Sequence, residues 1–294
     1  MDLSRRTIRS KQPCASGFRW LLKNSPEGGD YQQLIEALLA EGRVQDACWL
    51  VEQFGAVSER LVVDALDGDA VVFPGDVEVR GNVHADTVLR VAGTLRVRGS
   101  VRVGGAMQVA GDVIVEGGVH CDGECEIGGT LRTGWGVRAA ALRVKGDVRC
   151  GGELDVAGAL HAGGAVTAGR DVIAGGALDC GKSLRADGDV RCEESLRVAH
   201  GVLAAGSVRA GLHIEAGWGL QAGGDIVAGR SIVAGESLLA EGVIECGEGF
   251  GVFAGTGVMR DFWPDNAVVR AARRPRDLRS GHWEAAPECA EAGR

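Results

Sequence analysis

The hydrophobic and polar positions of this chain repeat every six residues over most of its length. From Gly75 onward, the third residue of each hexad is uncharged and usually aliphatic, and the fifth is Val, Ala or Cys with few exceptions. The fourth residue, between them, is usually polar and often arginine. Because side chains alternate between the two faces of a strand, third and fifth positions face one side and fourth positions the other. Each hexad therefore predicts a short strand followed by a corner.

The first two positions of the hexad have the chemistry of that corner. Glycine at the first position turns the backbone without a Cβ clash, and Asp, Ser or Thr at the second can bond to nearby backbone. Three hexads close a triangular coil of about eighteen residues. One residue is missing near Ala140, and the series then continues to Phe250. The predicted fold is all-β, a single-stranded parallel β-helix of about ten coils, and the pattern is compatible with either hand.

The two ends depart from the repeat and divide the chain into three predicted domains. We expect a helical N-terminal cap over residues 1–60, the parallel β-helix over 61–255, and a C-terminal cap with a loose tail over 256–294. In the first segment, Asp30 and Gln33 form a capping-box pattern before a helix that Gly42 ends, and a second helix ends at Gly55. A segment this small would be only marginally stable by itself, and we therefore expect it to cover the open first coil. Partner binding is the alternative.

After the repeat, the segments Phe262-Trp263 and Ala267–Arg270 are expected to fold over the last coil. From Arg273 the chain is rich in Arg, Pro, Glu and Ala, and we expect it to be loose.

The amino-acid composition excludes several classes of protein. With 48 glycines but only 6 prolines the chain is not collagen-like, and 45% apolar residues are too many for a disordered chain. A net charge of −8 favours solubility or a basic partner over nucleic acid. The sequence contains neither a leader nor a long apolar run, so we expect neither export nor insertion into a membrane. The nine cysteines, an odd number spread along the chain, indicate reduced thiols in the cytoplasm.

Candidate chemistry is sparse. Six cysteines occupy inward positions, and Cys121-x-x-x-Cys125 lacks zinc-site spacing, so neither a metal nor a cofactor is expected. Some hexad solenoids are acyltransferases that use a histidine between coils, and His84 and His120 should lie two coils apart on one side, which would also carry Arg102 and Arg138. His161 also faces outward. However, no long loop builds a pocket and no acidic partner is fixed beside any histidine, which predicts no enzyme and no catalytic residue.

Outward apolar residues give the sequence its strongest functional signal. They gather in the C-terminal third of the repeat, and two tryptophans replace corner residues. Such exposed residues mark a contact with a partner, with another copy or with the chain's own tail. The predicted partner-binding residues are Trp135, Trp218, Leu203, Val227, Val233 and Leu239.

The units of the type Gly75-Asp-Val-x-Val79 resemble those of bactofilins, bacterial cytoskeletal proteins whose β-helical rods polymerise end to end. The resemblance covers the repeat only and implies self-assembly. Covered ends at both termini argue against such growth.

A second resemblance covers nearly the whole chain. The motif Cys14-x-x-Gly17-x-x-Trp20, the repeat Gly217–Gly223 and the closing Gly249–Gly255 are similar to those of bacterial Gly-rich repeat proteins of polymorphic-toxin loci, including Rhs-type loci. This resemblance implies a cytosolic immunity protein that binds and neutralises a cognate toxin domain. A homodimer is compatible with it.

Overall fold

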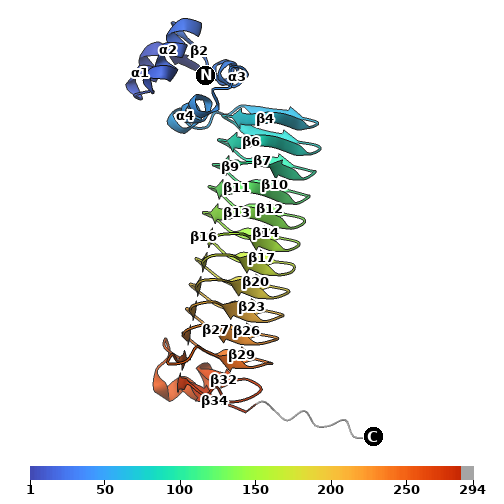
Figure 1. The fold of residues 1–294 in the computed structure, drawn as a ribbon, viewed down its shortest axis with the longest axis vertical. Coiled ribbons are helices and arrows are strands. Elements are labelled where there is room, and N and C mark those ends of the chain that lie inside the picture. Colours follow the sequence, from blue (N-terminus) through green and yellow to red (C-terminus); the bar gives the residue numbers. More distant parts are fainter. Residues whose placement is uncertain (286–294) are drawn as a thin grey trace. The chain divides into compact units, whose positions relative to one another are not determined.

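The computed structural model describes residues 1–285 and shows a parallel β-solenoid of about 12 turns with an N-terminal helical part (Figure 1). The predicted fold class is therefore confirmed, with more turns than the expected ten. The chain divides into two compact units, Met1–Gly129 and Thr130–Arg294.

Unit 1 begins with a small helical module. Its elements are β1 (Asp2–Ser4), α1 (Arg5–Ser10), α2 (Ala15–Asn24), β2 (Gly28–Asp30), α3 (Tyr31–Ala40) and α4 (Val44–Phe54). As predicted, Asp30 is the N-cap of α3, and its side chain accepts hydrogen bonds from the backbone N–H groups of Gln32 and Gln33. Gly42 and Gly55 follow α3 and α4 with φ of 68° and 71°, a conformation that glycine adopts without strain.

The helical module covers the first turn of the solenoid within unit 1. Its hydrophobic core, built around Tyr31 and Ile35, also contains Val72 from the first solenoid turn, and Ala92 packs against it. The helices therefore shield apolar residues at the start of the solenoid, as the sequence led us to expect.

The solenoid of unit 1 starts earlier than the glycine pattern suggests. Its strands are β3 (Arg60–Val63), β4 (Leu66–Phe73), β5 (Asp76–Val79), β6 (Val83–Val91), β7 (Leu95–Val97), β8 (Val101–Val103), β9 (Ala106–Val109), β10 (Val113–Val115) and β11 (Val119–Ile127). The strands β3 and β4 precede Gly75 and pair in parallel with β5 and β6. The register of β4 shifts between Gly68 and Ala70, which explains why this turn does not follow the hexad.

In unit 2 the strands stack on three sides. Side 1 contains β12 (Leu131–Thr133), β14 (Val148–Cys150), β17 (Val166–Ala168), β20 (Leu184–Ala186), β23 (Val202–Ala204), β26 (Leu220–Ala222), β29 (Leu238–Ala240), β32 (Val268–Arg270) and β34 (His282–Trp283). Side 2 contains the first half of β13 (Val137–Val144), then β15 (Leu154–Val156), β18 (Val172–Ala174), β21 (Val190–Cys192), β24 (Val208–Ala210), β27 (Ile226–Ala228) and β30 (Ile244–Glu245). Side 3 contains the second half of β13, then β16 (Leu160–Ala162), β19 (Leu178–Cys180), β22 (Leu196–Val198), β25 (Ile214–Ala216), β28 (Ile232–Ala234), β31 (Val252–Phe253) and β33 (Leu278–Ser280).

The missing residue of the repeat lies inside β13. Ala139 pairs with Val156 and Leu142 pairs with Leu160, so two residues form this corner where the next turn uses three. The slip predicted near Ala140 is confirmed. The prediction that the series then continues unbroken to Phe250 was wrong, because Ile232 pairs with Val252, twenty residues later, and Phe250 is exposed.

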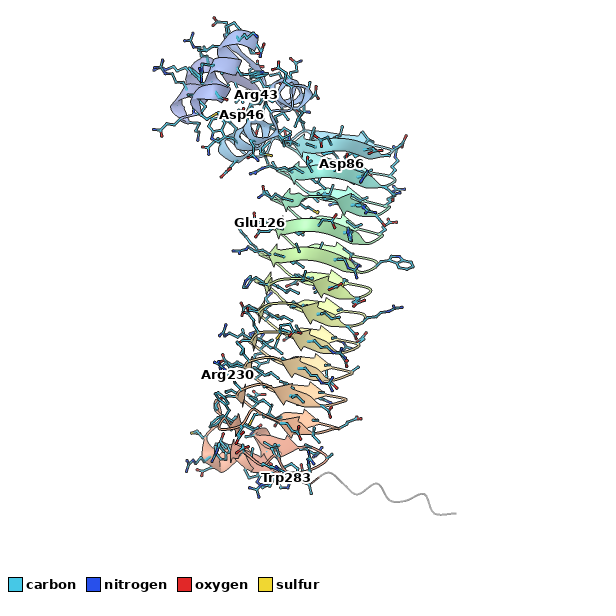
Figure 2. All side chains as sticks on the ribbon, viewed as in Figure 1. Arg43, Asp46, Asp86, Glu126, Arg230 and Trp283 are labelled. Atoms are coloured by element: carbon cyan, nitrogen blue, oxygen red, sulfur yellow. The ribbon has the colours of Figure 1, made fainter. Side chains whose placement is uncertain are left out.

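The inward residues of the hexads form the core. Third and fifth positions are buried along the solenoid, while fourth positions and corner residues project outward, among them Glu126 and Arg230 (Figure 2). Five of the six inward cysteines are buried, and burial raises the pKa of Cys150 to about 11 and that of Cys192 to about 12. Cys246 is only half-buried, because the chain leaves the hexad after β30.

The C-terminal segment differs from the expected cover. It adds further parallel strands, since β32 pairs with β29, β33 with β31, and β34 with β32. Between them lie η1 (Arg260–Phe262) and α5 (Trp263–Asn266). Phe262, which was expected to help cover the last coil, is itself half exposed. The segment from Arg273, which we expected to be loose, forms β33 and β34 up to Trp283, and residues 286–294 of that tail lie outside the described residues.

Candidate protein-binding surface

One corner of unit 2, between side 3 and side 1, carries a ladder of large side chains. Its members, which we call the corner ladder, are the central corner residues Lys182, His200, Trp218 and Glu236. Each donates its backbone N–H to the carbonyl of the corresponding residue one turn earlier, with N–O distances of 3.1 to 3.3 Å within the ladder. The side chains are therefore set one strand spacing apart, about 4.8 Å.

That spacing brings two aromatic rings into contact. The rings of His200 and Trp218 are stacked, with centroids 4.1 Å apart and an interplanar angle of 5°. Trp218 still exposes 51% of its surface. The stack presents a large, held aromatic face to the outside, which is the type of anchor that dominates protein interfaces.

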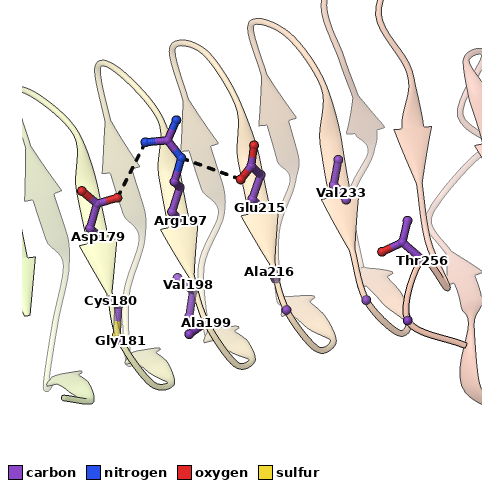
Figure 3. A pocket seen from close by; sticks show the side chains of 13 residues that line it. Asp179, Cys180, Gly181, Arg197, Val198, Ala199, Glu215, Ala216, Val233 and Thr256 are labelled. Carbon is purple, nitrogen blue, oxygen red and sulfur yellow. Dashed lines mark ion pairs between the residues drawn. The ribbon is translucent and has the colours of Figure 1, made fainter. Parts of the chain in front are cut away.

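On the side 3 flank of the corner ladder lies an open groove of about 690 Å³ (Figure 3). It crosses β19, β22, β25 and β28, and its floor includes small corner residues such as Gly181, Ala199 and Gly217. Val233 lines it, and Thr256 and Gly257 line it where the C-terminal segment leaves the solenoid. Because glycine or alanine occupies the first position of this corner in each of these turns, the groove follows from the repeat.

The outward side chains of three successive turns place charges along the groove. Arg197 lies between two carboxylates, 3.9 Å from Asp179 and 3.7 Å from Glu215 (Figure 3). Arg197 and Glu215 are about half exposed, so these pairs contribute little stability and remain available to exchange partners. Cys180 lines the groove as well, but burial raises the pKa of its thiol, which keeps it protonated.

On the side 1 flank of the corner ladder lie two outward leucines. Leu203 in β23 pairs in register with Gln221 in β26, which pairs with Leu239 in β29. Leu203 exposes 39% of its surface, and Leu239 is half-buried. The leucines therefore lie two turns apart, on the face next to the corner that carries Trp218.

The structure brings together four of the six predicted residues. Trp218, Leu203, Leu239 and Val233 lie on or beside the corner ladder. Val227 lies on side 2, half-buried between Arg209 and Glu245 in register, and so belongs to a different face.

Trp135 is also separate, at a corner between side 1 and side 2. It is 72% exposed, and its carbonyl accepts a hydrogen bond from the hydroxyl of Thr133. Folding of the chain into three sides thus divides a set that the linear sequence presented as one patch.

Sequence reasoning missed His200 and Arg197. The signal was present, because His200 and Trp218 are eighteen residues apart, and so are Arg197 and each of its carboxylates. Residues at this separation in a triangular solenoid are neighbours one turn apart.

The expectation that no acidic group lies beside a histidine was wrong. His84 lies 3.3 Å from Asp67 and 3.5 Å from Asp86, His120 lies 2.8 Å from Asp122, and His161 lies 2.9 Å from Asp179. The pair of His161 and Asp179 follows the eighteen-residue rule, whereas Asp67 comes from the irregular first turn, where the hexad gives no register.

The order of His84, Arg102 and His120 along one side of unit 1 is as predicted.

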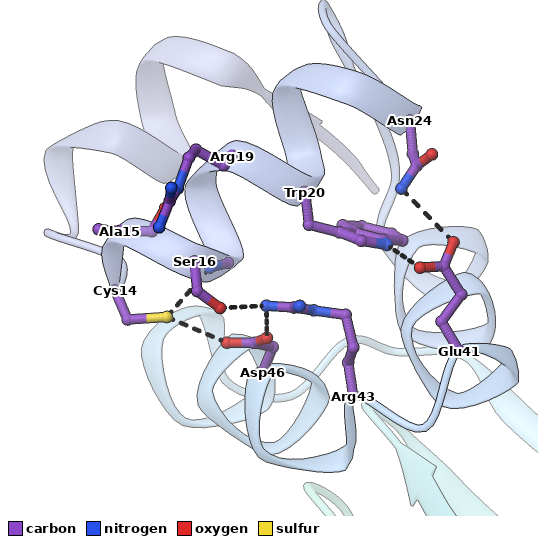
Figure 4. A network of polar contacts seen from close by, with 10 residues as sticks. Cys14, Ala15, Ser16, Arg19, Trp20, Asn24, Glu41, Arg43 and Asp46 are labelled. Carbon is purple, nitrogen blue, oxygen red and sulfur yellow. Dashed lines mark hydrogen bonds and ion pairs between the residues drawn. The ribbon is translucent and has the colours of Figure 1, made fainter.

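The motif Cys14-x-x-Gly17-x-x-Trp20 joins α2 to the two helices that follow (Figure 4). The Cys14 sulfur accepts the backbone N–H of Gly17 and lies 3.4 Å from Oδ1 of Asp46. A Cβ at Gly17 would lie 2.8 Å from that oxygen, which explains the glycine. Trp20 Nε1 donates to Glu41 at 2.7 Å. The motif is therefore explained by packing within the helical module.

Two further observations concern residues 1–285. No helix there is both long and apolar enough to cross a membrane, and no group of three or more His, Cys, Asp or Glu side chains is arranged to hold a metal ion.

Models of known families match both parts of the chain. The model of the YdhT N-terminal domain matches residues 1–56, which correspond to the helical module. The model of the Flagellar Assembly Protein A beta solenoid domain matches residues 63–223, more than half of the chain. No match was found among curated proteins or among solved structures. The family match fits a β-helix protein and does not bear on the resemblances to bactofilins or to proteins of polymorphic-toxin loci. By its solenoid, the chain belongs to the family of the Flagellar Assembly Protein A beta solenoid domain.

Proposed function

We propose that this chain is a non-enzymatic scaffold that binds a protein partner at the corner ladder of unit 2. The observation that carries the proposal is the stack of Trp218 on His200, which exposes a large aromatic side chain in a fixed position. Holding this side chain in place before binding lowers the entropy cost of forming an interface.

The surroundings of Trp218 have the composition of an interface. Apolar side chains lie on both flanks, Val233 in the groove and Leu203 and Leu239 on side 1, and the charges of the groove surround them. Hot spots are typically a buried aromatic anchor inside a polar rim. The groove would take an extended segment or a row of side chains of the partner.

For the identity of the partner we propose a cognate toxin domain, with the chain acting as its cytoplasmic immunity protein. The Gly-rich repeats and the N-terminal motif, similar to those of proteins from polymorphic-toxin loci, support this reading, and the net charge of −8 suits a basic toxin. The eight described cysteines are free, which suits a reducing compartment.

The second candidate is a scaffold for an assembly, and the family match favours it, since the matched family is named for flagellar assembly. In this reading, the corner ladder binds a component of the assembled structure. A bactofilin-like polymer grown end to end is less compatible with unit 1, where helices cover the first turn.

The test of the binding surface is the double variant Trp218→Ala with Leu239→Ala. We expect it to weaken partner binding by about a hundredfold or more, since hot-spot truncations cost about 2 kcal/mol or more each, and to leave thermal unfolding nearly unchanged. Trp135→Ala, an exposed tryptophan at another corner, is the matched control. Equal affinity of the double variant and the wild type, measured by calorimetry, would show that another surface binds.

Two measurements test the immunity reading and the bactofilin-like reading. Co-expression with the product of the gene directly before this one should relieve its toxicity if the chain is an immunity protein. Filaments in negative-stain images of the pure protein would instead support self-assembly, and a discrete monomer or dimer in size-exclusion chromatography would exclude it.

A further inference from the structure

We propose that the exposed surface of α1 and α2 in the helical module is a second binding site, which takes an acidic peptide segment of a protein partner. It is separate from the corner ladder and does not depend on it.

The charge distribution of unit 1 singles out this surface. Residues 1–24 contain six cationic side chains and one carboxylate, a net charge of +5, whereas residues 25–129 contain seven cations and eighteen carboxylates, a net charge of −11. The cations are Arg5, Arg6, Arg9, Lys11, Arg19 and Lys23, and all six are exposed. None of them forms an ion pair with any residue in the described part of the chain. A strongly cationic surface thus lies on an acidic unit.

Three of these arginines surround a hollow. Arg5, Arg6 and Arg9, together with Ser4 and Glu27, line an open concavity of about 370 Å³ beside α1. Guanidinium groups bind carboxylates through two parallel hydrogen bonds, which suits them to hold successive carboxylates of a peptide.

Local helix energetics do not account for Arg5 and Arg6, whereas Arg9 stands in the last turn, where the helix dipole favours a cation. Arg5 and Arg6 stand in the first turn of α1, where the helix dipole disfavours cations, and no acidic residue is present there. Arg5 and Arg9 are like charges four residues apart, which also destabilises a helix. Residues that break local rules without a structural gain are found at functional sites.

The partner is an acidic peptide and not a membrane or a nucleic acid. The apolar residue of α1, Ile8, is buried in the module core, so α1 offers no apolar face to insert into lipid. A long polyanion would leave the patch and meet the carboxylates of the rest of unit 1, which repel it. A short carboxylate-bearing segment fits within the cationic surface and avoids this repulsion.

The experiment uses the full chain and a fluorescein-labelled decaglutamate peptide, with binding measured by fluorescence anisotropy at low ionic strength. We expect the wild type to bind, and R5E/R6E/R9E to bind about tenfold more weakly or worse, as the loss of three exposed charge pairs implies. R96E/R98E/R102E is the matched control. It makes the same change of charge on exposed solenoid arginines of unit 1 that have no ion pair in the described structure, and it should bind within about twofold of the wild type.

Unfolding should not explain the expected loss, because glutamate at positions 5 and 6 favours the first turn of α1 and offsets the unfavourable glutamate at position 9 in the last turn. The neutral variant R5Q/R6Q/R9Q should lie between the wild type and R5E/R6E/R9E, with unchanged helical circular dichroism. Trp218→Ala with Leu239→Ala should bind decaglutamate like the wild type, so failure of the corner ladder would be distinguishable from failure of this site.

Undetectable binding by the wild type, or equal losses in the two charge-reversed triple variants, would overturn the proposal. Tighter binding of an oligothymidylate of the same charge would also overturn it and would indicate a nucleic-acid site.

Discussion

At the scale of single residues, the corner glycine of a hexad is required by the aspartate of the preceding turn. In unit 2, Oδ1 of Asp189 accepts the backbone N–H of Ser207, eighteen residues later, at 2.7 Å. A Cβ on Gly206 would overlap that same oxygen. The corner glycine of one turn therefore makes room for the acceptor of the turn before, which gives the repeated Gly-Asp pair a reason beyond turn propensity.

We predict that Gly206→Ala lowers the free energy of unfolding by about 1–3 kcal/mol, the usual cost of overpacking. The added methyl group must displace Asp189 or lengthen its hydrogen bond. Gly219→Ala is the matched control, because its Cβ would meet no atom closer than Ser237 O at 3.4 Å. Urea unfolding followed by circular dichroism measures both. Equal losses at the two glycines would show that backbone entropy, and not the contact at the corner, determines the loss of stability.

At the scale of elements, the helical module has a clear structural task. It buries Val72 of β4 and packs against Ala92, both of which would be uncovered without it. The backbone groups of β3 and β4 that face away from the following turn would also be open to pairing, as at any sheet edge.

A chain that begins at residue 57 should therefore self-associate. We expect it to elute as oligomers in size-exclusion chromatography with light scattering, while the full chain elutes as a discrete species. The control is Gly17→Ala, whose Cβ would lie 2.8 Å from Asp46 Oδ1. This variant destabilises the helical module but keeps it in the chain, so it separates the effect of a weakened module from that of a missing one. A monomeric truncated chain would show that the first turn needs no cover.

At the scale of the whole molecule, the corner carboxylates link stability to pH. Hydrogen bonds from the backbone N–H groups of Ala165 and Ser207 lower the pKa of Asp147 and of Asp189 below the ordinary value of 3.8. In the unfolded chain both groups bind protons more readily, so their contribution is fully present above that value. It is lost as the pH falls through the lowered pKa values of the folded state.

We accordingly predict that the wild type loses stability as the pH drops below about 4, and that Asp147→Asn with Asp189→Asn loses less over the same range. The amide oxygen of asparagine still accepts the hydrogen bond but does not titrate. Thermal unfolding between neutral pH and strongly acidic pH gives the comparison. Asp187→Asn, which changes a carboxylate paired with Arg185, is the control and should follow the wild type. Parallel curves for all three proteins would refute a role of the corner acceptors.

The order of residues by itself determined the solenoid, the inward and outward positions, the slip near Ala140 and the ends of α3 and α4. These features follow from local periodicity and capping, and each can be derived from a few neighbouring residues. It also located the outward aliphatic residues, because the fourth position of a hexad must face outward, and the exposed tryptophans, because they stand at corners.

Only the tertiary structure decided which of these residues meet. Side chains eighteen residues apart become neighbours, so His200 reaches Trp218 and Arg197 reaches two carboxylates, while Val227 and Trp135 move to other faces. The register of the first turn and the strands added at the end of the solenoid also escaped prediction, since parallel pairing and not the hexad holds β4, β32 and β34. The same physical reason explains why neither the contacts between turns nor the irregular turns could be predicted. A repeat encodes the form of each strand locally, but contacts between turns depend on register, which only the closed coil establishes.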